Sequence, residues 1–164
     1  MICSDRITIS QRHLLFATIL ISISISSALA QTQKSRGGPG PNDDSPTFQE
    51  YRSVRLGMTT EEVRKKLSNP SDKSDEQDFF VFNENESAQV FYDKSKKVFA
   101  ISINFMNGAP DIPTPKSIFG SELPAKPDGS MHKLVRYPKA GCWVSFSRTA
   151  GDAPLTTVTL QKIE

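Results

Sequence analysis

Apolar and polar residues alternate most clearly between residues 97 and 105. Successive side chains of an extended strand point to opposite faces, so this alternation predicts one apolar and one polar face. The large apolar side chains expected on one face are Phe99, Ile101, Ile103 and Phe105. Shorter apolar segments precede them at residues 79–82 and 88–92. Together these segments predict a first strand set, residues 79–105, folded as an antiparallel meander.

A second group of apolar segments occupies residues 131–137, 141–148 and 155–163. Turns that contain Gly and Pro separate them, which predicts a second strand set over residues 131–163. The two sets share a faint echo, in which a tyrosine precedes a polar turn and an apolar strand, and this leaves a duplication open. Residues 107–129, between the two sets, contain five prolines and are expected to form an irregular connection.

Upstream of the strands, one segment follows the rules for starting and continuing an α-helix. Thr59 suits the N-cap position, and Glu62 three residues later completes a capping box. Met58 and Val63 are placed for a hydrophobic staple across this cap. Val63 and Leu67 lie four residues apart and give the helix its buried stripe. Acidic residues in the first turn and basic residues in the last also favour the helix dipole.

A weaker helical spacing comes just before this segment. Apolar side chains recur every three residues after Pro46, which predicts a short helix within residues 47–55. Pro70 ends the helical region, so helices are expected within residues 47–69. The whole pattern predicts an α+β fold, with one or two short N-terminal helices packed on an antiparallel sheet of about five to six strands.

The first 30 residues have the pattern of a secretory signal peptide. Arg6 and Arg12 precede an apolar stretch at residues 14–21, and small residues lead to a cleavage site after Ala30. The alternative is an anchor helix that is retained, although serines interrupt its apolar run. The residue after the cleavage site is Gln31 rather than Cys, so no lipid anchor is expected. The mature protein is predicted to be exported, either periplasmic or extracellular.

Residues 31–46 contain no aliphatic or aromatic side chain and predict a flexible linker. A single domain is then expected over residues 47–164. Without the predicted signal peptide, 18 Lys and Arg face 17 Asp and Glu, a net charge of +1. This balance gives no electrostatic reason to expect binding to nucleic acid or to an anionic membrane. Cys142 is then the sole cysteine, so no disulfide within the chain is expected.

No arrangement of residues in the sequence predicts catalysis. Cys142 and His132 are a conceivable nucleophile and base, but Cys142 follows an apolar alternation that is typical of a buried structural cysteine. The acidic residues between Asp72 and Asp78 lack the spacing of a calcium loop, and no phosphate-binding or G-x-S-x-G motif occurs. No catalytic residue, cofactor or metal site is therefore predicted. A hydrolase that uses unidentified acids is the least favoured alternative.

Aromatic side chains on the predicted strands are better candidates for a functional site. Phe80, Phe82, Phe91 and Trp143 are the candidates for a sheet face that the helices leave open. Aromatic residues often anchor protein interfaces, so such a face would be a docking surface. The alternative is a second core layer or a covering loop from residues 107–129. Strand register decides between the two, and the sequence leaves the register open.

The capped helix belongs to a longer pattern formed by Val54, Leu56, Gly57, Met58, Thr59, Glu62, Val63, Leu67 and Pro70. With the aromatic strand and hairpin that follow, this pattern resembles the SmpA/OmlA (BamE-like) domain and the β-lactamase-inhibitor-protein-like fold. The resemblance covers roughly residues 47–105 and implies short helices on a small antiparallel sheet. It also implies binding to other proteins, because the first family serves the outer-membrane β-barrel assembly machinery and the second inhibits an enzyme.

Two departures from that pattern change the expectations. The lipoprotein family has a cysteine at the cleavage site, and this chain has none. Ser68 and Asn69 stand where a glycine usually precedes the proline, and Asn69 is expected to take the left-handed conformation at the helix end. The sequence predicts an exported, non-enzymatic domain that binds another protein or an envelope component through its sheet, with no stable membrane anchor. The first alternative is a small-ligand or lipid-binding domain with a cleft between helices and sheet.

Overall fold

The computed structural model describes residues 45–163, so the predicted signal peptide and nearly all of the predicted linker lie outside the described residues. In chain order the elements are β1 (Glu50–Tyr51), β2 (Val54–Arg55), α1 (Thr60–Leu67), β3 (Asp72–Lys73), β4 (Gln77–Asn83), β5 (Glu86–Tyr92), β6 (Val98–Phe105), α2 (Pro115–Phe119), β7 (Met131–Tyr137), the 3-10 turn η1 (Pro138–Ala140), β8 (Cys142–Arg148) and β9 (Thr156–Lys162). No helix in this part of the chain has the length and apolar character needed to cross a membrane.

Antiparallel strands dominate the fold. Within residues 45–163, a seven-stranded sheet has the order β3-β4-β5-β6-β9-β8-β7, and β1 and β2 form a separate hairpin. Strands β4 to β6 make one meander and β7 to β9 a second, and the final strands of the two pair in the middle of the sheet. A short helix precedes each meander. If the two meanders are compared strand by strand, β5 corresponds to β8. The echo in the sequence instead compares β5 with β7, so the echo does not follow the order of strands in the two meanders.

The six long strands overlap the six apolar segments of the sequence. The sheet nevertheless has one strand more than the expected maximum, because β3 lies in a polar segment that predicts a loop. Asp72 and Lys73 of β3 pair with Phe79 and Asp78 of β4. A short, charged strand at a sheet edge needs no apolar alternation, so its sequence resembles that of a loop.

The helix predicted within residues 47–55 is wrong, because this segment forms the β1–β2 hairpin. Arg52 and Ser53 make its two-residue turn, with φ of 47° and 65°. Positive φ at both central residues is the geometry that tight hairpins favour. Tyr51 packs edge-on against Phe82, with ring centroids 5.7 Å apart. Such tertiary contacts override a weak local helical spacing.

Helix α1 begins as the sequence predicts. The backbone N–H of Glu62 donates to Thr59 Oγ1 at 3.3 Å, and the backbone N–H of Thr59 donates to Glu62 Oε2 at 2.8 Å. These two hydrogen bonds confirm the capping box. Val63 is fully buried, and Met58 and Leu67 pack against the same core. The motif therefore positions the helix and buries its apolar stripe.

Unusual backbone conformations lie on both sides of α1. Gly57 has φ of +86°, and a Cβ atom there would meet nothing within 4 Å, so this glycine serves the backbone conformation rather than close packing. At the other end Ser68 has φ of 69° and ψ of −161°. The expectation that Asn69 takes the positive φ is wrong, because Ser68 takes it.

A second helix, α2, lies inside residues 107–129, where the prolines predict an irregular connection. Thr114 caps it through its side chain, Pro115 occupies its first turn, and Gly120 ends it with φ of 72°. Ile118 is 1% exposed and belongs to the core. A Thr-Pro start and a Gly end are sequence signals for a helix, but the neighbouring prolines obscure them.

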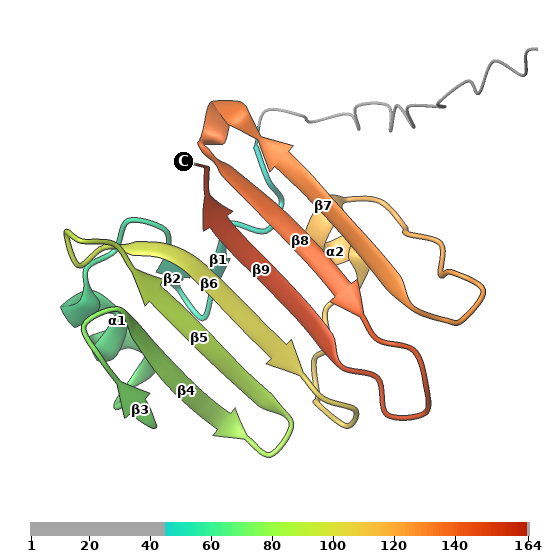
Figure 1. The fold of residues 1–164 in the computed structure, drawn as a ribbon, viewed down its shortest axis with the longest axis horizontal. Helices are drawn as coiled ribbons and strands as arrows, with labels where there is room; N and C mark the ends of the chain where they lie inside the picture. The colour runs from blue at the N-terminus through green and yellow to red at the C-terminus, as the bar shows by residue number, and fades with distance from the viewer. Residues whose placement is uncertain (1–44, 164) are drawn as a thin grey trace, which may run out of the picture. The chain divides into compact units, whose positions relative to one another are not determined.

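The helices and the β1–β2 hairpin cover one face of the main sheet. Val54 of β2, Val63 of α1 and Ile118 of α2 share one core with the strands. The buried strand residues of that core are Phe80, Ala88, Val90, Tyr92, Val98, Ile101, Ile103, Phe105, Tyr137, Cys142, Val144, Phe146, Val158 and Leu160. Figure 1 views the sheet from its other side, with β1, β2 and α2 behind the strands. Within residues 45–163 the helices and the hairpin lie on one side of the sheet; we call that side the covered face and the opposite side the uncovered face.

Candidate binding surface

The uncovered face consists of the strand side chains that alternate with those of the core. Strand register aligns one row across the six long strands, namely Phe79, Gln89, Ser102, Thr159, Ser145 and Leu134. Two further rows flank it and run from Val81 to His132 and from Gln77 to Arg136. Small polar side chains fill the middle of the face, and large apolar side chains lie toward both outer edges.

The polar side chains in the middle of the uncovered face pair with one another across strands. Thr157 Oγ1 donates to Asn104 Oδ1 at 2.8 Å, and the hydroxyls of Ser102 and Thr159 are 3.3 Å apart. These cross-strand pairs fix the orientation of polar groups before any partner arrives. The middle of the face is therefore an ordered polar surface.

Two of the four aromatic candidates lie on the uncovered face and two do not. Phe91 and Trp143 alternate with core residues and are half-exposed. The predictions for Phe80 and Phe82 are wrong. Phe80 is 2% exposed and belongs to the core, because the alternation of β4 turns it toward the helices. Phe82 also lies on the covered side, where the Arg52 guanidinium stands 4.2 Å from its ring centroid.

Phe99 is a site residue that the sequence places on the wrong face. The alternation predicts that it shares the face of Ile101, but the β5–β6 ladder shifts register so that Phe91 pairs with Ala100 and Tyr92 with Val98. Phe99 is therefore the extra residue of a β-bulge, which re-aims its side chain. No residue type in this segment marks a bulge, so the sequence carries no signal for it.

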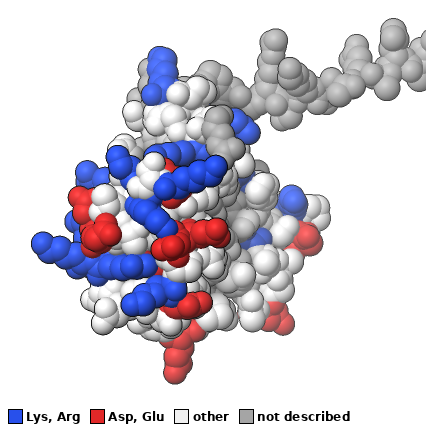
Figure 2. All heavy atoms as spheres, turned by 60° about the vertical axis from the view of Figure 1, so that its left-hand side comes forward, with Lys and Arg blue, Asp and Glu red and all other residues white. Residues whose placement is uncertain are grey.

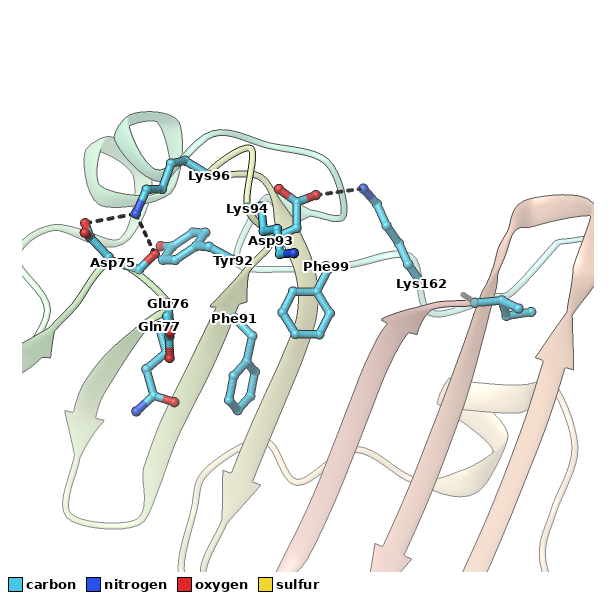
Figure 3. A pocket seen from close by; sticks show the side chains of 11 residues that line it. Asp75, Glu76, Gln77, Phe91, Tyr92, Asp93, Lys94, Lys96, Phe99 and Lys162 are labelled. Carbon is cyan, nitrogen blue, oxygen red and sulfur yellow. Dashed lines mark hydrogen bonds and ion pairs between the residues drawn. The ribbon is translucent and has the colours of Figure 1, made fainter.

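A pocket opens at one corner of the uncovered face, beside the β5–β6 turn and the end of β9. Figure 3 shows the rings of Phe91 and Phe99 side by side, with charged side chains beyond one end of the pair. The pocket is lined by Asp75, Glu76, Gln77, Phe91, Tyr92, Asp93, Lys94, Lys96, Phe99, Lys162 and Ile163. We call it the corner pocket. Its two phenylalanine rings belong to the uncovered face, whereas the small-ligand alternative requires a cleft between helices and sheet.

Charge is distributed unevenly between the uncovered face and its surroundings. The three rows of the uncovered face contain no Asp, Glu or Lys, and their charged or titratable members are Arg136 and His132 on β7. The side of the molecule that carries α1 presents basic and acidic side chains intermixed (Figure 2). Low charge together with aromatic side chains is typical of the centre of a protein interface.

Asp78 is a buried carboxylate that ties α1 to the sheet. Its side chain is fully buried, and Arg64 of α1 donates to both of its oxygens at 2.8 Å. The Tyr92 hydroxyl donates to the same carboxylate at 2.8 Å. Burial raises the pKa of Tyr92, and the contact with Asp78 raises it further. Both Asp78 oxygens and the Tyr92 hydroxyl are engaged within the fold, so the role of this group is structural.

Glu86 ties the β1–β2 hairpin to the sheet in a similar way. Arg52 Nη2 lies 3.0 Å from both of its carboxylate oxygens, and the Tyr51 hydroxyl donates to one of them. Burial acts to raise the pKa of Glu86, but the hydrogen bonds from Tyr51 and Arg52 outweigh burial and hold the pKa below its usual value. No buried side-chain nitrogen or oxygen of the described residues lacks a hydrogen-bond partner.

Cys142 and His132 do not form a catalytic pair. Cys142 is 4% exposed on the covered face, and burial raises the pKa of its thiol. His132 lies on the uncovered face, at the opposite end of the β7–β8 ladder. A thiol with a raised pKa is a poor nucleophile, so Cys142 serves packing.

The acidic residues from Asp72 to Asp78 do not converge on one point. Asp78 points into the core, whereas Asp72, Asp75 and Glu76 are exposed. Across residues 45–163, no three His, Cys, Asp or Glu side chains gather in a way that could hold a metal ion.

Comparisons with protein-family models, with curated proteins and with solved structures find no match for this chain. The resemblance to the BamE-like and inhibitor folds therefore stays a prediction from the capped helix and the strands that follow it.

Proposed function

We propose that the chain is an exported, non-enzymatic α+β domain that binds another protein of the cell envelope or secreted space through the uncovered face. One observation carries this proposal: the uncovered face combines half-exposed aromatic side chains with three rows that contain no acidic residue. Trp and Arg are among the residues that most often dominate binding energy at interfaces. Trp143 and Arg136 are neighbours in one row of this face.

The size of the uncovered face also suits a protein partner. Six strands spaced about 4.8 Å apart, each about 23 Å long, give a flat area of roughly 600 Å². A standard protein interface takes roughly 800 Å² from each partner. The face and a modest part of its rim therefore provide enough surface for a specific complex.

The resemblance to protein-binding families supports the same proposal from different residues. The residues that carry it, such as Thr59 and Val63, cap α1 and bury its stripe on the covered side. They explain why one face of the sheet is covered. The residues that contact a partner are therefore expected among the strand residues that face away from the helices.

Photo-crosslinking in the native host tests the proposal. A p-benzoylphenylalanine side chain at position Gln89 or Thr159, in the middle of the uncovered face, is expected to give a discrete crosslinked protein. The same group at Lys65, an exposed position of α1, is the matched control and should give none. Trp143→Ala should lower the yield from Gln89 at least fivefold and lower the thermal unfolding midpoint by only about 4 °C. A product at Lys65 without one at Gln89 would contradict the proposal.

Export has a separate test. N-terminal sequencing of the protein purified from its native host is expected to begin at Gln31, because the small residues before it suit signal peptidase. Recovery of the chain with its first residues intact, in the soluble cytoplasmic fraction, would rule out this part of the proposal.

A further inference from the structure

The corner pocket has an aromatic floor that the fold leaves open. Phe91 and Phe99 lie on neighbouring strands, with ring centroids 6.1 Å apart and ring planes at 51° (Figure 3). Both side chains are half-exposed. Large apolar side chains are usually buried because exposure to water is unfavourable. Two adjacent rings that stay partly exposed in a pocket are therefore a surface that a ligand can cover further.

The bulge in β6 creates this floor. In a regular strand Phe99 would share the covered face with Ile101, which is fully buried. The extra residue instead places Phe99 beside Phe91 and leaves Val98, which is also fully buried, to fill the core. Bulges are typical of places where a strand must re-aim one side chain. The bulge in β6 therefore produces the pair of aromatic rings on the uncovered face.

Among the described residues, the charged side chains that line the corner pocket balance to zero net charge. Lys96 Nζ lies 3.0 Å from Asp75 Oδ1, and Lys162 Nζ lies 3.9 Å from Asp93 Oδ2. Lys94 and Glu76 add one charge of each sign. An anionic or cationic ligand would meet as much repulsion as attraction and would have to separate existing pairs. An uncharged apolar group avoids that cost.

We propose that the corner pocket is the anchor point of the uncovered face and receives an uncharged aromatic side chain from a loop of the partner protein. This inference rests on the proposed function. An incoming ring can meet Phe91 and Phe99 edge-to-face, the arrangement that aromatic rings favour. The ion pairs at the rim then exclude water around the inserted ring, as polar rims do around interface hot spots.

The occupant is a side chain of a protein because the pocket is continuous with the rest of the face. Phe91 belongs to the same row as Trp143, three strands away, which corresponds to about 14 Å. A loop anchored at Phe91 and Phe99 therefore reaches Trp143 with a second side chain. Two such anchors on one flat surface require a partner of protein size.

Solution NMR with small probes tests the anchor directly. N-acetyl-L-tryptophanamide, an uncharged aromatic side chain with capped termini, is titrated into ¹⁵N-labelled domain. Saturable shifts are expected at the amides of Phe91, Phe99 and Lys96, with a Kd of about 1 mM. N-acetyl-L-glutamate amide and inorganic phosphate should produce no saturable shift there. Equal binding of phosphate, or no saturable shift with the tryptophan probe, would overturn the proposal.

Matched variants separate the pocket from the rest of the face. Phe99→Leu keeps an apolar side chain but removes the ring, and it should weaken probe binding at least fivefold. Phe79→Leu makes the same change on the same face outside the pocket and should leave the Kd unchanged. Thermal unfolding midpoints of both variants establish that they fold. An equal loss of probe binding in the two variants would overturn the assignment to the corner pocket.

The crosslinking experiment distinguishes a failure of this inference from a failure of the proposed function. Phe99→Leu should reduce the crosslinked product at Gln89 along with probe binding. If the product persists in full while probe binding is lost, the interface stands and the anchor is wrong. If the probe binds but no position on the uncovered face crosslinks to a protein, the proposed function fails and the protein-loop anchor fails with it.

Discussion

The two faces of the main sheet are built from alternate residues of the same strands, but they follow opposite rules. On the covered face, apolar side chains such as Phe146 are almost fully buried, and the buried carboxylates are held by cations from α1 and the β1–β2 hairpin. On the uncovered face, polar side chains pair sideways and aromatic side chains such as Trp143 stay half-exposed. Residues on the covered face are therefore expected to determine stability, and residues on the uncovered face to determine binding. Substitutions should be able to change one property without the other.

The largest expected effect tests this separation within one strand. Phe146→Ala should lower the free energy of unfolding by about 4 kcal/mol, because it removes a buried ring and leaves a cavity. Trp143→Ala, on the other face of β8, should lower it by only about 1 kcal/mol, since its ring is already half-exposed. Urea denaturation measures both values. Similar losses would mean that the uncovered face is a second core, and Trp143 would lose its role as an anchor.

The next effect concerns how the covering layer is attached. Arg64→Ala should cost about 3 kcal/mol, because it leaves the buried Asp78 carboxylate without its cation. Lys65→Ala changes the neighbouring exposed residue and should cost no more than about 0.5 kcal/mol. The same urea measurements compare the two variants. A loss below about 1 kcal/mol for Arg64→Ala would show that water reaches Asp78 when the arginine is absent.

The elements with strong local rules could be predicted from the sequence. The capping box around Thr59 and Glu62 fixes the start of α1, and apolar segments bounded by turns locate the six long strands. These signals depend on near neighbours in the chain, so one sequence contains them. The hairpin at residues 50–55 shows the limit, because contacts with distant aromatic residues decide its structure.

The candidate site was less accessible to sequence analysis, because its residues are chosen by strand register. Phe80 and Phe91 are both strand phenylalanines, but alternation sends Phe80 to the core and Phe91 to the uncovered face. The bulge then moves Phe99 against the simple alternation. Register and bulges depend on pairing between strands, and a shift of one residue exchanges the two faces.

A smaller effect is expected at the start of the covering helix. Thr59→Ala removes the side chain that accepts the Glu62 N–H and should cost about 1 kcal/mol of stability. Thr59→Ser retains the hydroxyl and should cost almost nothing. Neither change should alter the Kd of the tryptophan probe, because Thr59 belongs to the covered side. A change in that Kd would mean that the capping of α1 affects the corner pocket. The two faces would then not be independent.

The smallest effect concerns Glu86, which holds the β1–β2 hairpin on the covered face. Hydrogen bonds from Tyr51 and Arg52 lower its folded-state pKa below the unfolded value. Its stabilising contribution is therefore present above the unfolded pKa and is lost as the pH falls through the folded pKa. Glu86→Gln should therefore reduce the urea midpoint at pH 7 more than at pH 3. Glu84→Gln, in the exposed turn before β5, is the control for the effect of replacing any exposed glutamate by glutamine. The Arg52 side chain is 45% exposed, so solvent screening keeps the difference small. An equal reduction at both pH values would mean that the shape of the Glu86 side chain, rather than its charge, holds the hairpin.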